Sequence, residues 1–137
     1  MTRINLVDPS ELSDQHLVAE YREIFMVGSS LQRSLKSKNW EKTLANIPEK
    51  YTLNKGHVTF FYNKGKYLYK RYELLIEEMK NRGMNPDSER KFKTEQWPEE
   101  LFNDWEPEPG DYKIIRARIK EKIEMKPDWY RFTKNKT

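Results

Sequence analysis

Residues 10–37 read SELSDQHLVAEYREIFMVGSSLQRSLKS, and their apolar positions have the spacing of one long amphipathic helix. The apolar side consists of Leu17, Tyr21, Ile24, Leu31 and Leu35. Ser10 or Ser13 can cap the start of the helix, and Asp14 suits its first turn. Gly28 falls on the same apolar side, where we expect either a close approach to another helix or a local break.

Two further stretches, residues 66–82 and 111–125, have the same periodicity. Their apolar sides consist of Leu68, Tyr72, Leu75 and Met79 in the first, and of Tyr112, Ile115, Ile119 and Ile123 in the second. Gly83 and Pro127 follow the two stretches and are typical of helix ends. The sequence therefore predicts an all-α fold: one compact domain over residues 1–137, with three main helices and long irregular connections.

The connections are long for a chain of this length. Residues 38–63 are expected to be mostly irregular, and the apolar run at 57–62 fits either a strand or a buried loop. Residues 84–110 are rich in proline and acidic residues. We expect this second connection to be anchored by Trp97, Phe102 and Trp105.

Charge is distributed unevenly along the chain. The net charge is only +4, but residues 95–111 carry seven acidic residues and no Lys or Arg. Residues 113–136 then carry nine basic residues against three acidic ones. This asymmetry fits a basic face for phosphates, and it also fits the solvated surface of a helix.

Several functions are excluded by composition. The absence of cysteine excludes disulfides, thiolate nucleophiles and cysteine-ligated zinc, and two histidines are too few for most histidine-based metal sites. No apolar stretch is long enough to span a membrane, and nothing resembles a signal peptide. The sequence predicts a cytoplasmic protein with no membrane partner.

Two polar stripes of the first helix are candidates for function. His16, Glu20 and Glu23 share one stripe at positions i, i+4 and i+7, a spacing compatible with a weak metal site. The other interpretation is a solvated face on which the two glutamates pair with nearby bases. The neighbouring stripe carries Gln15, Ala19, Arg22, Met26 and Arg33.

The start of the chain offers a nucleophile if Met1 is removed. Thr2 would then carry a free α-amine with a pKa of about 7.7–8.0, so that much of it is neutral at cellular pH, unlike a lysine near 10.4. An amine with a nearby carboxylate such as Glu23 is sufficient for Schiff-base chemistry on a sugar carbon.

Several blocks of the sequence resemble one known family. They are residues 2–6 (TRINL), 14–17 (DQHL), 19–23 (AEYRE), 56–62 (GHVTFFY), 70–71 (KR), 117–118 (AR), 121–123 (EKI) and 127–130 (PDWY). In this order and spacing they are similar to the pyrimidine-dimer DNA glycosylase/AP lyases of T-even phages. The resemblance covers nearly the whole chain, and residues 84–100 are the most divergent part.

The resemblance implies a three-helix fold with the N-terminus threaded between helices. It implies a metal-independent, cofactor-free reaction on duplex DNA that carries UV photoproducts or abasic sites, performed by a monomer in a bacterial nucleoid or phage-infected cytoplasm. The implied catalytic residues are Thr2, Glu23 and Arg22. The implied DNA-binding residues are Arg3, Gln15, His16, Arg22, Arg33, Arg118, Lys122, Trp129 and Tyr130.

The chain departs from this family directly after Glu23. The phage enzyme has a proline and an arginine there, and this chain has Phe25 and Met26. Loss of one charge-assisted contact typically costs about 1.5–3 kcal/mol. Three outcomes stay open: the same reaction with other cations, a related lesion as substrate, or a binder of distorted duplex without catalysis.

Trp129 and Tyr130 have a second interpretation, as anchors that attach the tail to the core.

Overall fold

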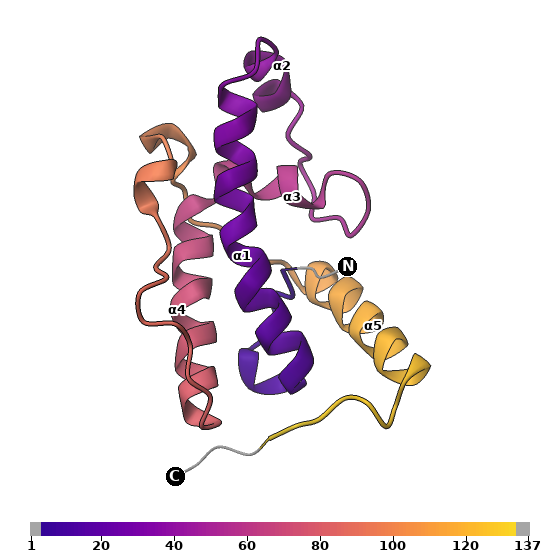
Figure 1. The fold of residues 1–137 in the computed structure, drawn as a ribbon. Helices are drawn as coiled ribbons and strands as arrows, with labels where there is room; N and C mark the ends of the chain where they lie inside the picture. Colours follow the sequence, from indigo (N-terminus) through magenta and orange to yellow (C-terminus); the bar gives the residue numbers. More distant parts are fainter. Residues whose placement is uncertain (1–3, 134–137) are drawn as a thin grey trace.

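The computed structural model describes residues 4–133, and every regular element in that range is helical. Two helices, α1 (Asp14–Leu35) and α4 (Gly65–Asn81), lie side by side and run antiparallel (Figure 1). The third long helix, α5 (Pro109–Met125), is drawn on the other side of α1 (Figure 1). The predicted all-α class with three main helices is confirmed.

α1 begins later than residue 10 because a separate 3-10 turn, η1 (Pro9–Glu11), precedes it. Ser13 is the cap: its Oγ accepts a hydrogen bond from the backbone N–H of His16 at 3.0 Å. The predicted apolar side forms the core, where Leu17, Ile24 and Leu31 are fully buried and Leu35 is partly buried.

α4 packs its apolar side against α1 and ends as the sequence predicts. Leu68, Tyr72, Leu75 and Met79 are all buried. Gly83 adopts a φ of +82°, a left-handed conformation that glycine reaches without steric cost. Its N–H and that of Met84 donate to carbonyls of the last helical turn at 3.0 and 2.9 Å, which closes the helix.

A charged cluster ties the end of α4 to the start of α1. The buried guanidinium of Arg82 donates to Glu78 Oε2 at 2.7 Å and to Asp14 Oδ1 at 2.9 Å. It also donates to the carbonyl of Pro9 at 3.1 Å. A buried arginine requires such partners, because its five N–H donors cannot be deprotonated.

The segment between α1 and α4 is more helical than expected. It contains α2 (Trp40–Ala45), and the apolar run forms α3 (His57–Phe60) followed by the 3-10 turn η2 (Phe61–Asn63). Neither a strand nor a loop was therefore correct for residues 57–62. Gly56, at a φ of +106°, starts the turn, and its carbonyl accepts from the N–H of Phe60 at 2.8 Å. A short apolar run has no periodicity by which to distinguish these cases.

Gly28 marks a close approach to another helical element, the 3-10 turn η3 (Thr94–Gln96), which was one of the two expectations. α1 is continuous there, and a Cβ at this position would overlap the side chain of Gln96. A Cβ on Gly65 would similarly lie 2.7 Å from the ring of Trp97. The connection after α4 therefore packs onto two glycines, and Trp97 anchors it as predicted, with 5% of its surface exposed.

α5 is attached to the rest of the molecule through one apolar edge. Ile115 is fully buried, and Tyr112 and Ile119 are partly buried against the core. Arg116 also bonds Glu11 of η1, with Nη2 3.0 Å from Oε2. In the part of the chain that the structure describes, no helix is both long and apolar enough to cross a bilayer.

Candidate active site and DNA-binding face

The chain enters the fold through a buried N-terminal segment, Ile4–Val7, whose four residues are each at most 5% exposed. The N–H of Ile4 donates to Nε2 of His57 at 3.0 Å, and the hydroxyl of Tyr51 donates to the Ile4 carbonyl at 2.8 Å. Nδ1 of His57 donates to the carbonyl of Thr52 at 2.8 Å, which leaves Nε2 as the acceptor. Both backbone polar groups of Ile4 are thus fixed by side chains.

The next residue is fixed by a buried carboxylate on α1. Both the backbone N–H and the side-chain amide of Asn5 donate to Oε1 of Glu20, at 3.1 and 2.9 Å. Arg71 of α4 donates to the same carboxylate, from Nε to Oε2 at 2.6 Å and from Nη2 to Oε1 at 3.0 Å. Arg71 Nη1 also donates to the carbonyl of Val7. The ion pair therefore connects α1, α4 and the N-terminal segment.

This arrangement corrects the sequence interpretation of Glu20. Glu20 is fully buried, so it does not lie on a solvated face, although it does pair with a base. Because its two oxygens are engaged by Asn5 and Arg71, it is not placed to bind a metal with His16 and Glu23. Over residues 4–133, no group of three His, Asp or Glu side chains is arranged to hold a metal ion.

Glu23 lies one turn after Glu20 on α1, but its burial and its contacts differ from those of Glu20. It is half-buried, and it makes no hydrogen bond or ion pair with any residue that the structure describes. Its carboxylate is therefore open to a ligand, beside the place where the N-terminal segment meets α1. Thr2 and Arg3, which the sequence assigned to the same site, lie outside the described residues.

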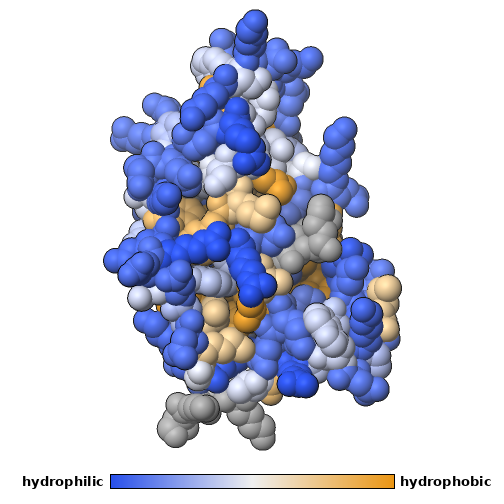
Figure 2. Space-filling model, viewed as in Figure 1, coloured by the Kyte–Doolittle hydropathy of each residue, from blue (hydrophilic) through white to orange (hydrophobic). Residues whose placement is uncertain are grey.

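Of the second polar stripe predicted on α1, Arg22, Met26 and Arg33 are exposed, whereas Gln15 and Ala19 are half-buried. Arg22 and Arg33 both point away from the core, and neither forms an ion pair with another described residue. Met26 lies between them and is 56% exposed. Figure 2 shows hydrophilic side chains over most of this face, with small apolar areas between them. The stripe offers cations to a negatively charged surface.

Gln15 and His16, at the start of α1, contact the C-terminal tail. Gln15 Nε2 donates to the carbonyl of Trp129 at 2.5 Å, and its Oε1 accepts from the N–H of Arg131 at 3.0 Å. The ring of His16 stacks on Tyr130, with centroids 4.8 Å apart and planes 7° apart. The structure therefore brings together four residues that sequence reasoning placed in the DNA-binding set.

The tail residues Trp129 and Tyr130 have different surroundings. Tyr130 is half-buried against His16, which agrees with the interpretation of an anchor. Trp129 is 55% exposed and meets Tyr130 edge-on, with ring centroids 4.9 Å apart. Trp129 therefore presents most of its indole to solvent beside the start of α1, where a planar partner could stack on it.

Electrostatics link His16 to α5. Burial lowers the pKa of His16, and the positive charge of Lys122 lowers it further, although Glu20 opposes both effects. Arg118, one turn before Lys122 on α5, lies with Nη1 3.8 Å from Oε1 of Glu121. Lys122 thus belongs to the group around His16, whereas Arg118 is partly neutralised on its own helix.

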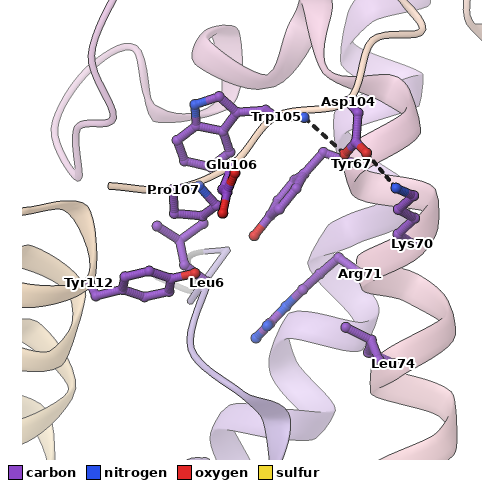
Figure 3. A pocket seen from close by; sticks show the side chains of 10 residues that line it. All are labelled: Leu6, Tyr67, Lys70, Arg71, Leu74, Asp104, Trp105, Glu106, Pro107 and Tyr112. Atoms are coloured by element: carbon purple, nitrogen blue, oxygen red, sulfur yellow. Dashed lines mark hydrogen bonds and ion pairs between the residues drawn. The ribbon is translucent and has the colours of Figure 1, made fainter. Parts of the chain in front are cut away.

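A pocket of about 570 Å³ lies behind the anchoring ion pair. Figure 3 shows the ring of Tyr67 and the guanidinium of Arg71 extending into it from α4, with Leu6 of the N-terminal segment opposite. An ion pair between Lys70 and Asp104 closes its rim. Burial raises the pKa of Tyr67, so the phenol stays protonated. Arg71 lines the pocket, whereas Glu23, Arg22 and Arg33 do not.

Sequence reasoning gave no role to the residues that hold the N-terminal segment, namely Asn5, Tyr51, His57 and Arg71. One signal was available. Arg71 falls three positions after Leu68 and four before Leu75, within the apolar side of α4, and Glu20 is placed similarly between Leu17 and Ile24. Opposite charges inside two apolar seams that pack together indicate a buried ion pair.

The class of protein follows from a comparison with known protein families. A family model described as pyrimidine dimer DNA glycosylase matches residues 1–92. The chain therefore belongs to the pyrimidine dimer DNA glycosylase family, and membership implies glycosylase activity on damaged DNA. The match contains α1, α4 and all the residues that hold the N-terminal segment; α5 and the tail follow it.

Proposed function

We propose that this protein excises the 5′ base of UV-induced cyclobutane pyrimidine dimers and then cleaves the strand as an AP lyase. After removal of Met1, the α-amine of Thr2 attacks C1′ as the N-glycosidic bond breaks. The amine nitrogen gives up both of its protons, one to the departing base and one to O4′ as the sugar ring opens, which leaves an imine between the nitrogen and C1′. Abstraction of a proton at C2′ then expels the 3′ phosphate by β-elimination.

The observation that carries this proposal is the attachment of Ile4 and Asn5 to His57 and Glu20. A nucleophile at a frayed terminus would be poorly placed, whereas catalysis requires reacting atoms held within a few tenths of an ångström. Buried hydrogen bonds hold the chain two residues after Thr2, at a turn of α1 that is adjacent to the turn carrying Glu23. This attachment supports a nucleophile that is held close to Glu23.

Glu23 and Arg22 have the chemistry that the reaction requires. Departure of the base leaves positive charge on the sugar, which the carboxylate of Glu23 would stabilise, and the same carboxylate can then accept the C2′ proton. The exposed guanidinium of Arg22 would favour the neutral form of a nearby amine and bind a flanking phosphate. No metal or other cofactor enters this scheme.

The proposed DNA-binding set extends from α1 to the tail: Arg3, Gln15, His16, Arg22, Arg33, Arg118, Lys122, Trp129 and Tyr130. Extruding a nucleotide from a duplex costs a few kcal/mol, and less at a damaged step, so an exposed aromatic such as Trp129 can compensate part of that cost by stacking. Gln15 already bonds the tail, but its amide retains a second N–H for a base or phosphate. The protein would act as a monomer on duplex DNA with photoproducts or abasic sites.

The test is borohydride trapping of the imine on three matched duplexes, with a thymine dimer, an abasic site or no lesion. A covalent adduct on the dimer duplex, insensitive to EDTA and lost when an uncleaved residue precedes Thr2, is the expected result. An adduct on the abasic duplex alone would limit the activity to the lyase step. Tight binding without any adduct would contradict an enzymatic function and indicate a protein that only binds distorted duplex DNA.

A further inference from the structure

The connection after α4 places an arginine over the side of α1. The guanidinium carbon of Arg90 lies 4.2 Å from the centroid of the Phe25 ring, a cation–π contact. The backbone of Arg90 is also held, because its N–H donates to the carbonyl of Asp87 at 3.2 Å and its carbonyl accepts from the hydroxyl of Tyr72 at 3.4 Å. Arg90 forms no ion pair with any residue between 4 and 133.

A pocket of about 290 Å³ opens between this connection and α1, and its charge is strongly positive. Arg90, Lys91 and Lys93 line it, against a single acidic residue, Glu89. Ser29 also lines it from the α1 side, and its hydroxyl donates to the carbonyl of Phe25 at 3.5 Å. Three cations with one counter-charge around a small opening attract an anion, and a guanidinium and ammonium groups are donors that proteins use to hold phosphate.

The pocket lies beside a gap in the exposed stripe of α1. Arg22 and Arg33 are eleven positions apart, or about 16 Å along the helix, and the exposed side chain between them at Met26 carries no charge. Phe25, next to Met26, carries the guanidinium of Arg90 on its ring. Arg90 therefore supplies positive charge at the level of α1 where the stripe itself has none.

We propose that Arg90, positioned by Phe25, binds a backbone phosphate of the duplex that lies along α1, with Lys91 and Lys93 completing the site. The ring holds the guanidinium plane in place, so that less conformational freedom is lost when its two parallel N–H groups engage phosphate oxygens. Phe25 is a positioning residue in this arrangement. The inference rests on the proposed function, because it takes DNA as the ligand.

The first experiment measures the affinity of Arg90→Gln for an undamaged duplex as a function of salt. Loss of one phosphate contact should raise the Kd about tenfold and reduce the slope of log K against log salt by about 0.9. The matched control is Lys66→Gln, which removes one exposed cation from the start of α4, near Asp104, and should leave the slope unchanged. Equal affinities and slopes for the two variants would overturn the phosphate site.

The second experiment tests the role of Phe25 with a double-mutant cycle. Phe25→Leu keeps an apolar side chain but removes the ring, so Arg90→Gln should weaken binding several-fold less in that background. Urea unfolding of Phe25→Leu establishes that the variant is folded. The same effect of Arg90→Gln in both backgrounds would overturn the positioning by Phe25.

The two proposals fail in different ways. An imine adduct from the wild-type protein, with Arg90→Gln binding DNA as Lys66→Gln does, overturns the phosphate site alone. Weaker and less salt-dependent DNA binding by Arg90→Gln, together with no imine adduct from the wild-type protein, supports the phosphate site and overturns the proposed enzymatic activity. A wild-type protein that binds no duplex at any salt concentration overturns both.

Discussion

Glu20 and Arg71, fifty-one residues apart, form a two-point ion pair inside the core, with side-chain exposures of 0% and 3%. Their remaining hydrogen-bonding capacity is directed at Asn5 and Val7. Burying two charges costs free energy, but the buried pair attaches the N-terminal segment to α1 and α4. A charge inside the core is tolerated because its partner and the backbone satisfy it.

Glu20→Gln should strongly destabilise the protein, because it leaves the guanidinium of Arg71 buried without its counter-charge. We expect the free energy of unfolding to fall by about 3–5 kcal/mol. The measurement is urea unfolding at neutral pH. Glu23→Gln, the same change one turn along the helix, is the matched control and should stay within about 0.5 kcal/mol of wild type. Equal midpoints for the two variants would contradict a buried anchoring role.

Glu23→Gln should instead affect chemistry. Because the amide cannot stabilise positive charge on the sugar, the rate of borohydride trapping on the dimer duplex should fall by about 10²–10⁴-fold. Because the amide also cannot accept the C2′ proton, cleavage of the strand at an abasic site should slow as well. Binding of an undamaged duplex should not weaken, since a negative charge is removed. Glu77→Gln, at an exposed position of α4, controls for the loss of one carboxylate. Trapping and strand cleavage that both proceed at the wild-type rate would remove Glu23 from the mechanism.

His16 should titrate below its usual pKa of 6.5, chiefly because it is buried against the tail. The unfolded chain then binds more protons than the native state in mildly acidic solution, so this group destabilises the fold as pH falls through about 6.5. Tyr130→Leu removes the stacked ring and should move the pKa of His16 upward. Histidine NMR titrations of both proteins measure the shift. An unchanged value in Tyr130→Leu would show that the tail does not bury His16 in solution.

Asp14 should contribute stability that is lost in acid. Although its partial burial opposes ionisation, hydrogen bonds from Thr133 and Arg82 hold its pKa below the usual 3.8. The contribution is therefore complete above that value and disappears as pH falls through the lower, native pKa. Asp14→Asn should lose about 1.5–3 kcal/mol of unfolding free energy at pH 7 and much less at pH 3. Urea unfolding at the two pH values, with exposed Glu73→Gln as control, checks this; a loss independent of pH would contradict it.

The three long helices could be predicted because each has an apolar seam at helical spacing, and such seams are read directly from residue order. The end of α4 was found for the same local reason, because Gly83 closes it. The start of α1 was predicted four residues too early, although Ser13, one of its two candidate caps, is the cap. The run at 57–62 could not be assigned, because six mostly apolar residues are too few to show a period in the sequence. Its helical form depends on the turn at Gly56 and on burial against α1.

The same distinction applies to the candidate site: features that one helix sets could be predicted, and features that depend on distant contacts could not. The exposed stripe with Arg22 and Arg33 follows from the geometry of one helix, so the sequence predicts it correctly. The opposite fates of Glu20 and Glu23 do not follow, because the two residues have the same chemistry and lie on one stripe only three positions apart. They differ because Arg71 and Asn5 reach one of them and no described residue reaches the other.

By itself, the sequence determined the three long helices, which side of each of them is apolar, and to which family the chain is similar, because all three depend on residue order and spacing. Only the tertiary structure decided which charges are buried, what holds the start of the chain, and that Arg90 rests on Phe25. Those outcomes depend on contacts between residues far apart in the chain, and local periodicity carries no information about which distant side chains will meet.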